Sequence, residues 1–185
     1  MKTITDKIDE TQPFSTELRR VYLALFISAA VIINVVEFVI PLPVPWFRFG
    51  FANIFVLLAI FFFGFWDALT VTVLRVLISS LMVGKFLTPA FFLAMSGGIT
   101  STVAMYTIFA IGRRHLSLVG VSVVGSFTHS IAQILTAYLL FVKHSGVFSI
   151  LPIFLIVSLI TGIINGMAAN YLTRILQAVV RDRGV

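Results

Sequence analysis

The sequence contains no cysteine, and only 7 of its 185 residues are Asp or Glu. The absence of cysteine excludes disulfide bonds, thiolate metal sites and a cysteine nucleophile. Between the two polar ends of the chain the only acids are Glu37 and Asp67, which fall in different apolar segments. A close pair of carboxylates for general acid and base chemistry is therefore missing. The sequence predicts no catalytic residue, no metal site and no cofactor.

Motifs of nucleotide and metal chemistry are missing as well. Gly120 and Gly125 have the spacing of a phosphate-binding loop, but Ser126 and Phe127 stand where that loop requires Lys followed by Ser or Thr. The zinc-protease pattern HExxH does not occur. We therefore expect that the chain is not an enzyme and has no energy source of its own.

Charge of either sign is scarce. Only 11% of the residues are charged, against about a quarter in soluble domains, whereas 59% are hydrophobic and 19 are Phe. The mean hydropathy is +1.10. This composition predicts a multi-pass protein of the plasma membrane. The basic residues are scattered between apolar runs without forming a stripe, so the net charge of +6 indicates membrane orientation and not nucleic-acid binding.

The apolar runs predict an all-α integral membrane protein with six transmembrane helices in residues 18–176, between cytoplasmic tails at 1–17 and 177–185. The run from Gly50 to Gly84 would reach about 50 Å as one helix, against about 30 Å of hydrocarbon, so it must fold back, and Gly64 to Asp67 suits that turn. The predicted helices lie at about 18–40, 47–64, 67–83, 88–112, 117–142 and 148–176.

The basic residues between these helices predict the orientation. Nine fall on one side: Lys2, Lys7, Arg19, Arg20, Arg113, Arg114, Arg174, Arg181 and Arg183. Three fall on the other: Arg48, Lys85 and Lys143. Because cytoplasmic loops are enriched in Lys and Arg, both termini are predicted to be cytoplasmic.

The segment from Pro41 to Asn53, PLPVPWFRFGFAN, lies on the predicted outer side. Prolines at 41, 43 and 45 favour an extended cap because proline fixes φ and disfavours a helical residue before it. The cap holds Arg48 at the membrane boundary, with Asn53 one to two turns into the next helix. We interpret this segment as the mouth of a binding site in a small membrane transport protein.

Glu37 and Arg75 are charged residues inside predicted helices, with apolar residues on both sides. Arg75 lies in the middle of the third helix, where an Arg costs about 2.5 to 3.5 kcal/mol, so it should face a partner, a polar cavity or a ligand. Ser79 shares its face. Glu37 should face the bundle or the mouth, and its partner could be Arg48, Arg75 or a ligand.

The fifth helix carries Ser122, Ser126, His129 and Gln133 on one face, at spacings of four, three and four. Such a face predicts the wall of a polar cavity, although a single core His is more often an ordinary hydrogen-bonding residue.

Small residues predict three places where helices approach closely. The stretch SGGITS at 96–101 favours helix packing over a cavity wall, and Gly162 and Gly166 have the GxxxG spacing. Ala24 and Ser28 form a small-residue strip that would contact either this bundle or a partner helix.

Several motifs occur in a fixed order: RFGFANIF at 48–55, then Arg75, GKFLTPAF at 84–91 with SGG at 96–98, and GSFTHSIAQ at 125–133. With them, residues 18–176 resemble the Gx transporter family, whose members are often labelled heptaprenyl diphosphate synthase component I. The resemblance implies kinship with the substrate-binding S components of energy-coupling factor (ECF) transporters. Those have six helices in the lipid bilayer, a transmembrane T protein as partner and two cytoplasmic ATPases. It also implies that Ala24 and Ser28 are the docking strip for the T protein, with Ser28 in place of a second Ala.

These observations predict an S component-like subunit that captures a small anionic or amphipathic molecule from outside. Arg48, Arg75 and Lys85 would supply positive charge, Glu37, Asn53, Ser79, His129 and Gln133 would complete the polar site, and Phe residues would cover an apolar portion. The family label suggests a prenyl phosphate or quinone precursor, with vitamins next. An alternative is a non-catalytic membrane anchor or regulatory subunit of a prenyl diphosphate synthase, although the aspartate-rich motifs of such synthases are absent here. A third is a membrane enzyme that uses His129 and Arg75.

Overall fold

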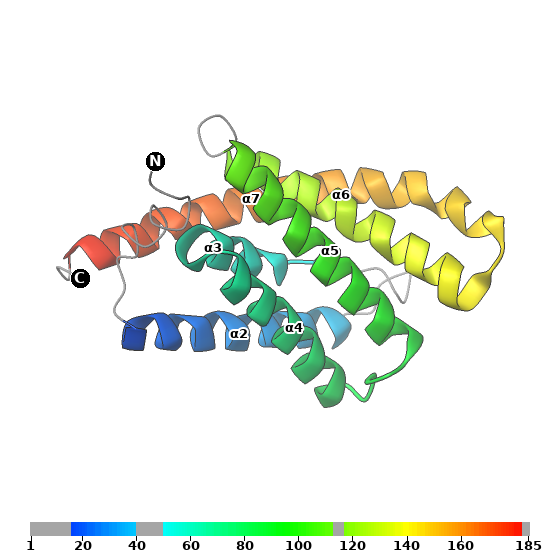
Figure 1. Cartoon of the computed structure of the whole chain (residues 1–185), viewed down its shortest axis with the longest axis horizontal. Coiled ribbons are helices and arrows are strands. Elements are labelled where there is room, and N and C mark those ends of the chain that lie inside the picture. Colours follow the sequence, from blue (N-terminus) through cyan, green and yellow to red (C-terminus); the bar gives the residue numbers. More distant parts are fainter. Residues whose placement is uncertain (1–15, 40–49, 113–116, 183–185) are drawn as a thin grey trace, which may run out of the picture.

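The computed structural model describes residues 16–39, 50–112 and 117–182, and every regular element in this part of the chain is helical. The helices are α2 (Thr16–Val39), α3 (Asn53–Phe63), α4 (Phe65–Met82), α5 (Pro89–Gly112), α6 (Leu118–Ala137) and α7 (Leu151–Asp182). A π-helical turn, η1 (Tyr138–Val142), extends α6, and a 3-10 helix, η2 (Ser145–Ile150), precedes α7. The predicted all-α class is confirmed (Figure 1).

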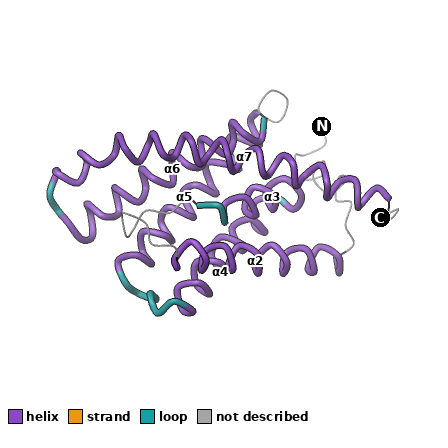
Figure 2. The backbone as a smooth tube through the Cα atoms, turned by 180° about the vertical axis from the view of Figure 1, so that it is seen from behind, coloured by secondary structure: helices purple, strands orange, loops and turns teal. Residues whose placement is uncertain are grey.

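The helices pack as a bundle around α3. α6 packs along both α5 and α7, α4 lies between α2 and α5, and α3 contacts α2, α4, α5 and α7. Both views show that α2 begins and α7 ends at the same end of the molecule (Figures 1 and 2).

Most helix boundaries agree with the predicted ones, and three differ. α3 begins at Asn53, about six residues after the predicted start at 47. The turn at Gly64 is confirmed, with Gly64 at a φ of 90° between α3 and α4. α7 begins at Leu151 and continues to Asp182, six residues beyond the predicted end at 176. The last turn of the predicted fifth helix is π-helical and ends at Lys143, whose φ of 48° is left-handed.

In the part of the chain that the structure describes, five helices are long and apolar enough to cross a membrane: α2, α4, α5, the continuous helix from α6 through η1, and α7 with η2. The protein is therefore a multi-pass membrane protein. α3 has 11 residues, about 17 Å of helix, which is roughly half of the hydrocarbon thickness. Eight of those residues are buried, as expected for a helix that is apolar on all sides and enclosed by others. A sixth span through residues 47–49 depends on residues outside the described part.

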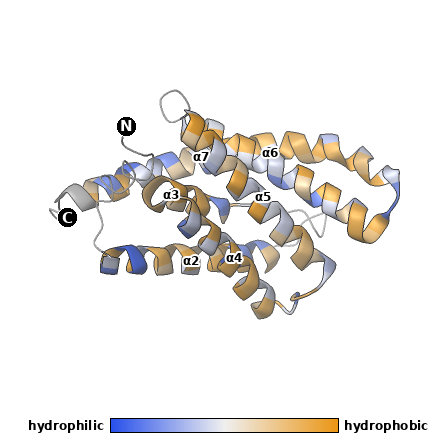
Figure 3. Cartoon of the chain, viewed as in Figure 1, coloured by the Kyte–Doolittle hydropathy of each residue, from blue (hydrophilic) through white to orange (hydrophobic). Residues whose placement is uncertain are grey.

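Apolar side chains cover the outside of the bundle. Ile32, Leu81, Leu139 and Ile156, on four different helices, are more than half exposed. Hydrophobic colour runs along most of each helix, whereas hydrophilic residues gather at the start of α2 and at the turn between α6 and α7 (Figure 3). This pattern suits a bundle whose long helices face lipid.

Glycines set the close contacts between helices. A Cβ at Gly162 would lie 2.8 Å from the Cα of Val123, and one at Gly166 would lie 2.5 Å from the Cα of Val119. Both distances are shorter than carbon atoms allow, so α7 can approach α6 this closely only with glycine at these positions. The predicted GxxxG packing is confirmed.

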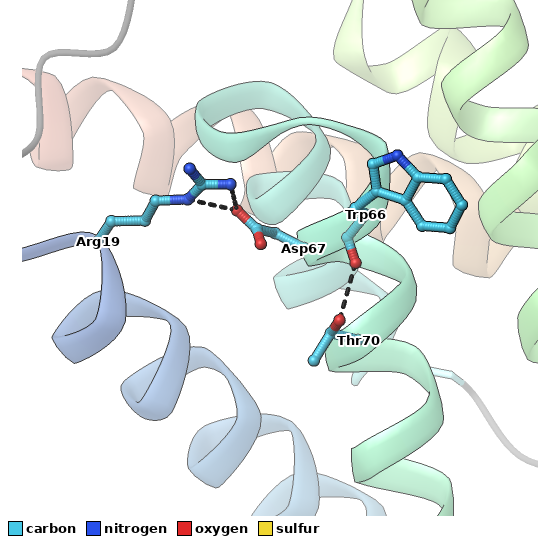
Figure 4. Close-up of polar contacts among 4 residues, drawn as sticks. All are labelled: Arg19, Trp66, Asp67 and Thr70. Atoms are coloured by element: carbon cyan, nitrogen blue, oxygen red, sulfur yellow. Dashed lines mark hydrogen bonds and ion pairs between the residues drawn. The ribbon is translucent and has the colours of Figure 1, made fainter. Parts of the chain in front are cut away.

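An ion pair ties α2 to α4 at the end where α2 begins (Figure 4). Arg19 donates from Nη2 and Nε to Oδ2 of Asp67, at 2.6 and 2.7 Å. Trp66 points away from the pair and is 75% exposed, as expected for an interfacial Trp. Asp67 and Glu37 therefore lie toward opposite ends of the bundle, since Glu37 is near the end of α2.

Candidate functional site

A polar cavity lies where α2, α3, α4, α5, α6 and α7 meet inside the bundle. Its volume is about 50 Å³. We call it the polar cavity; its lining residues are Asn34, Glu37, Gly50, Asn53, Arg75, Val76, Ala94, Ser126, His129, Ser130, Gln133, Phe154, Val157, Ser158 and Thr161.

The start of α3 forms one wall and is held by three other helices. Arg75 donates from Nη2 to Oδ1 of Asn53 at 2.6 Å, and the backbone N–H of Phe51 donates to Oε1 of Glu37 at 2.7 Å. Asn165 donates from Nδ2 to the carbonyl oxygen of Gly50 at 3.1 Å. The first amides of a helix lack partners within it, and a carboxylate near them is favourable because the helix N-terminus is positive. These contacts fix the polar start of α3 against α2, α4 and α7.

This wall lies deep in the bundle. Arg75 follows Asp67 by eight residues on α4, about 12 Å along a helix, and Asp67 pairs with Arg19 at one end of the bundle. The positive end of a short helix therefore opens to a polar cavity near the middle of the apolar bundle. Transporters place the N-termini of discontinuous helices in this way where anionic substrate groups bind.

The structure brings together five of the predicted site residues, because Glu37, Asn53, Arg75, His129 and Gln133 all line the polar cavity. Glu37, Arg75 and Asn53 are buried, with 5%, 4% and 8% of their surface exposed.

Two further predicted residues lie next to it. Ser79 and Lys85 line a smaller cavity of about 20 Å³ that shares Asn34, Val76 and Ala94 with the polar cavity. The Oγ of Ser79 accepts from Nδ2 of Asn34 at 3.0 Å. The Nζ of Lys85 lies 3.8 Å from the ring centre of Phe38. Arg48 and the cap from Pro41 to Trp46 lie outside the described residues.

The predicted polar face of α6 lines the cavity with three of its four members. Ser126, His129 and Gln133 do so, whereas Ser122 lies at the contact with α7, where its Cβ would be 3.1 Å from a Cβ at Gly166. On α5, Gly97 packs against His129 and Gln133, and Gly98 packs against Thr72 of α4. The SGG stretch is therefore a packing element, as the sequence favoured.

Sequence reasoning missed the polar groups that α7 contributes. Ser158 and Thr161 line the polar cavity, and the Oγ of Ser158 lies 2.6 Å from the Oγ of Ser130 on α6. Their spacing of three residues within an apolar helix was a visible signal, because it places both on one helix face. Asn34, one turn before Glu37 on α2, and Ser130 on α6 line the cavity and were also missed.

A larger apolar groove lies beside the polar cavity, with a volume of about 500 Å³. It is bounded by the starts of α5 and α7, the end of α6, η1 and η2. We call it the apolar groove; its lining residues are Lys85, Thr88, Pro89, Ala90, Leu93, Ala94, Gln133, Ile134, Ala137, Phe141, Val142, Val147, Ile150 and Phe154. Ala94, Gln133 and Phe154 line both spaces, so the polar cavity and the apolar groove adjoin.

The side chains that line the polar cavity and the apolar groove are of the kinds that bind a ligand. Arg75 in the polar cavity and Lys85 in the apolar groove are the groups suited to an anion. Among the described residues, no group of three or more His, Asp or Glu side chains is placed to hold a metal ion.

The small-residue strip on α2 faces outward, because Ala24 and Ser28 are both exposed, whereas the neighbouring Ala30 is buried within the bundle. The small side chains of Ala24 and Ser28 leave a shallow surface that another helix could approach.

Comparison with known protein families matches residues 26–172 to the family described as Heptaprenyl diphosphate synthase component I. No curated protein and no solved structure matches the chain. The matched segment runs from α2 to α7 and contains every wall of the polar cavity and the apolar groove. The chain therefore belongs to the heptaprenyl diphosphate synthase component I family.

Proposed function

We propose that this chain is the substrate-binding membrane subunit of an importer of the ECF type, and that it is not an enzyme. It captures a small anionic or amphipathic molecule from outside the cell. The observation that carries this proposal is the polar cavity, where a buried Arg75 and the start of α3 meet in the middle of an apolar bundle. Charged residues at such depth are costly, and they mark substrate pathways in membrane proteins.

The polar contacts around the polar cavity support a binding role. Asn53 holds Arg75, and the amide of Phe51 holds Glu37, so both charges are positioned by the start of α3. An anionic group in the cavity would gain the Arg75 charge and the positive end of α3. His129 and Gln133 on α6 would orient its polar atoms, while Glu37 offers an acceptor to a hydroxyl or amine.

The arrangement of the ends supports the orientation. α2 begins and α7 ends at the same end of the molecule, where Arg19 and Arg20 on α2 and Arg174 on α7 are basic. We place this end in the cytoplasm of a plasma-membrane protein. The family description names one component of a larger assembly. We propose that the other components are a transmembrane T protein and two cytoplasmic ATPases.

A second candidate function follows from the same description, which names a synthase. In that case the chain would be a non-catalytic membrane anchor or regulatory subunit of a prenyl diphosphate synthase. The polar cavity would then have no ligand from outside, and the partner would be a soluble enzyme.

Co-purification separates the two candidates. We expect the affinity-tagged chain, solubilised from its native membrane in mild detergent, to bring down a T protein and ATPases. The double variant Ala24→Trp/Ser28→Trp should lose them, because indole rings prevent close helix contact at the exposed strip. Val103→Trp, at an exposed position on α5, is the matched control and should retain them. Recovery of a prenyl diphosphate synthase without ATPases would refute the transport role.

A further inference from the structure

The polar cavity is too small for a whole small-molecule ligand. Its volume is about 50 Å³, and a buried water needs about 10 to 15 Å³ of such space, so it holds roughly three to five waters. Typical ligand pockets measure about 300 to 1,000 Å³. A compact head group, such as one phosphate or carboxylate, is therefore the largest part of a ligand that fits here.

The apolar groove has the size that the polar cavity lacks. Its volume of about 500 Å³ lies within the range of ligand pockets, and its walls are apolar apart from Lys85, Thr88 and Gln133. Ala94, Gln133 and Phe154 belong to both walls, and the small side chain of Ala94 leaves room between them. A chain attached to a head group in the polar cavity would enter the groove at this place.

The wall formed by η1 is an independent sign that the groove serves a function. α6 becomes π-helical at Tyr138–Val142, and Phe141 and Val142 of this turn line the groove. π-helical turns are rare, and they occur frequently at functional sites. A tightly wound α-helix would place these two side chains differently, so the turn shapes the groove.

The charges around the polar cavity and the apolar groove favour a head group of negative charge. Arg75 lines the polar cavity, Lys85 lines the groove, and the positive start of α3 contacts both Arg75 and Glu37. A compact head of negative charge complements this side. The glycerol backbone of a bilayer lipid, together with its phosphate, exceeds the space of a few waters.

We infer that the site takes an amphiphile with a compact anionic head and a single apolar chain, with the head in the polar cavity and the chain in the apolar groove. This inference rests on the proposed function and names the substrate class of that site. Gln133 and Phe154 lie at the junction of head and chain.

Binding of n-decyl phosphate to the purified protein in phosphatidylcholine nanodiscs tests the inference. Radiolabelled n-decyl phosphate is the probe, empty nanodiscs give the background, and unlabelled inorganic phosphate, decanol and dioleoyl phosphatidic acid are competitors. We expect n-decyl phosphate to bind at least about tenfold tighter than inorganic phosphate, because burial of each methylene adds affinity. Decanol should compete weakly, since it lacks the anion.

Variants of the groove provide the second arm. Ala137→Trp fills the groove and should reduce n-decyl phosphate affinity to the level of inorganic phosphate. Val147→Trp, on η2, fills it from another side and serves if Ala137→Trp does not fold. Ala110→Trp, at an exposed position near the end of α5, is the matched control and should bind like wild type.

Three outcomes would overturn the inference. Equal binding of n-decyl phosphate and inorganic phosphate, or no effect of either groove variant, would show that the groove takes no chain. Equally tight, groove-dependent binding of dioleoyl phosphatidic acid would make the groove a bilayer-lipid site. If these results appear while the T protein and ATPases still co-purify, only this inference fails; loss of those partners is what would overturn the proposed function.

Discussion

The contact between Arg75 and Asn53 allows a test that separates a ligand-binding Arg from a structural one. We predict that the double variant Arg75→Met/Asn53→Leu folds about as stably as wild type but loses affinity for n-decyl phosphate. Met keeps an unbranched apolar stem on α4, and Leu removes the amide that would otherwise remain buried on α3.

The magnitudes follow from the burial of the pair. Both side chains are under 10% exposed, and the Nη2 to Oδ1 distance is 2.6 Å, so the charged hydrogen bond contributes about 1.5 to 3 kcal/mol. Removing an Arg from the middle of a membrane helix gains about 2.5 to 3.5 kcal/mol. The free energy of unfolding should therefore change by between about −0.5 and +2 kcal/mol. The single variant Arg75→Met should be less stable than the double variant by about 1 to 3 kcal/mol, because Oδ1 of Asn53 stays buried without this donor.

The assay pairs reversible denaturation in mixed detergent micelles, followed by circular dichroism, with n-decyl phosphate binding in nanodiscs. We expect stability near wild type together with at least a tenfold loss of affinity, about 1.4 kcal/mol. Wild-type affinity in the stable double variant would refute the assignment of Arg75 to the site. A loss of stability above about 3 kcal/mol would show that Arg75 chiefly holds the bundle together.

Two predictions concern the framework. Gly166→Ala should lower the free energy of unfolding by about 1 to 3 kcal/mol in the same denaturation assay, because its Cβ would lie 2.5 Å from the Cα of Val119. Met167→Ala, at a position 61% exposed, is the control and should change the free energy of unfolding by less than about 0.5 kcal/mol. Equal effects of the two variants would contradict the packing argument. Asp67→Asn should lower the free energy of unfolding by about 1 to 2 kcal/mol. This value lies between those of exposed and buried ion pairs, because the side chains of Arg19 and Asp67 are 34% and 15% exposed. The exchange Arg19→Asp/Asp67→Arg should recover more than half of the loss, and no recovery would mean that the ion pair itself is not the stabilising contact.

Much of the fold was readable in the sequence because the bilayer imposes strong rules. Apolar runs with few charges predicted α2, α4, α5, α6 and α7, and the turn at Gly64 followed from the length of the run from Gly50 to Gly84. The GxxxG contact was also readable, because close helix packing in lipid depends on small side chains. The short length of α3 could not be predicted from the sequence, because its start at Asn53 depends on contacts from Glu37 and Arg75 on other helices.

The candidate site was predicted in part. Polar and charged groups are costly in lipid, and on this ground each of five residues was predicted separately as a site residue. The structure shows that all five line a single cavity: Glu37, Asn53, Arg75, His129 and Gln133. Ser122 shared the helical face of His129 but lies at the α6 and α7 contact, because the close approach at Gly166 covers it. Periodicity gives the face of a helix and not the neighbour that occupies it.

The sequence by itself determined that this chain is helical, lies in the membrane and carries costly polar groups that need a common environment. Only the tertiary structure decided that α3 begins near mid-depth, that the polar cavity is small and that an apolar groove adjoins it through Ala94, Gln133 and Phe154. The physical reason is that the cost of placing a polar side chain in lipid depends on that residue and its position along its own helix. The volume of a cavity and the residues that line two spaces depend instead on how helices distant in sequence pack together.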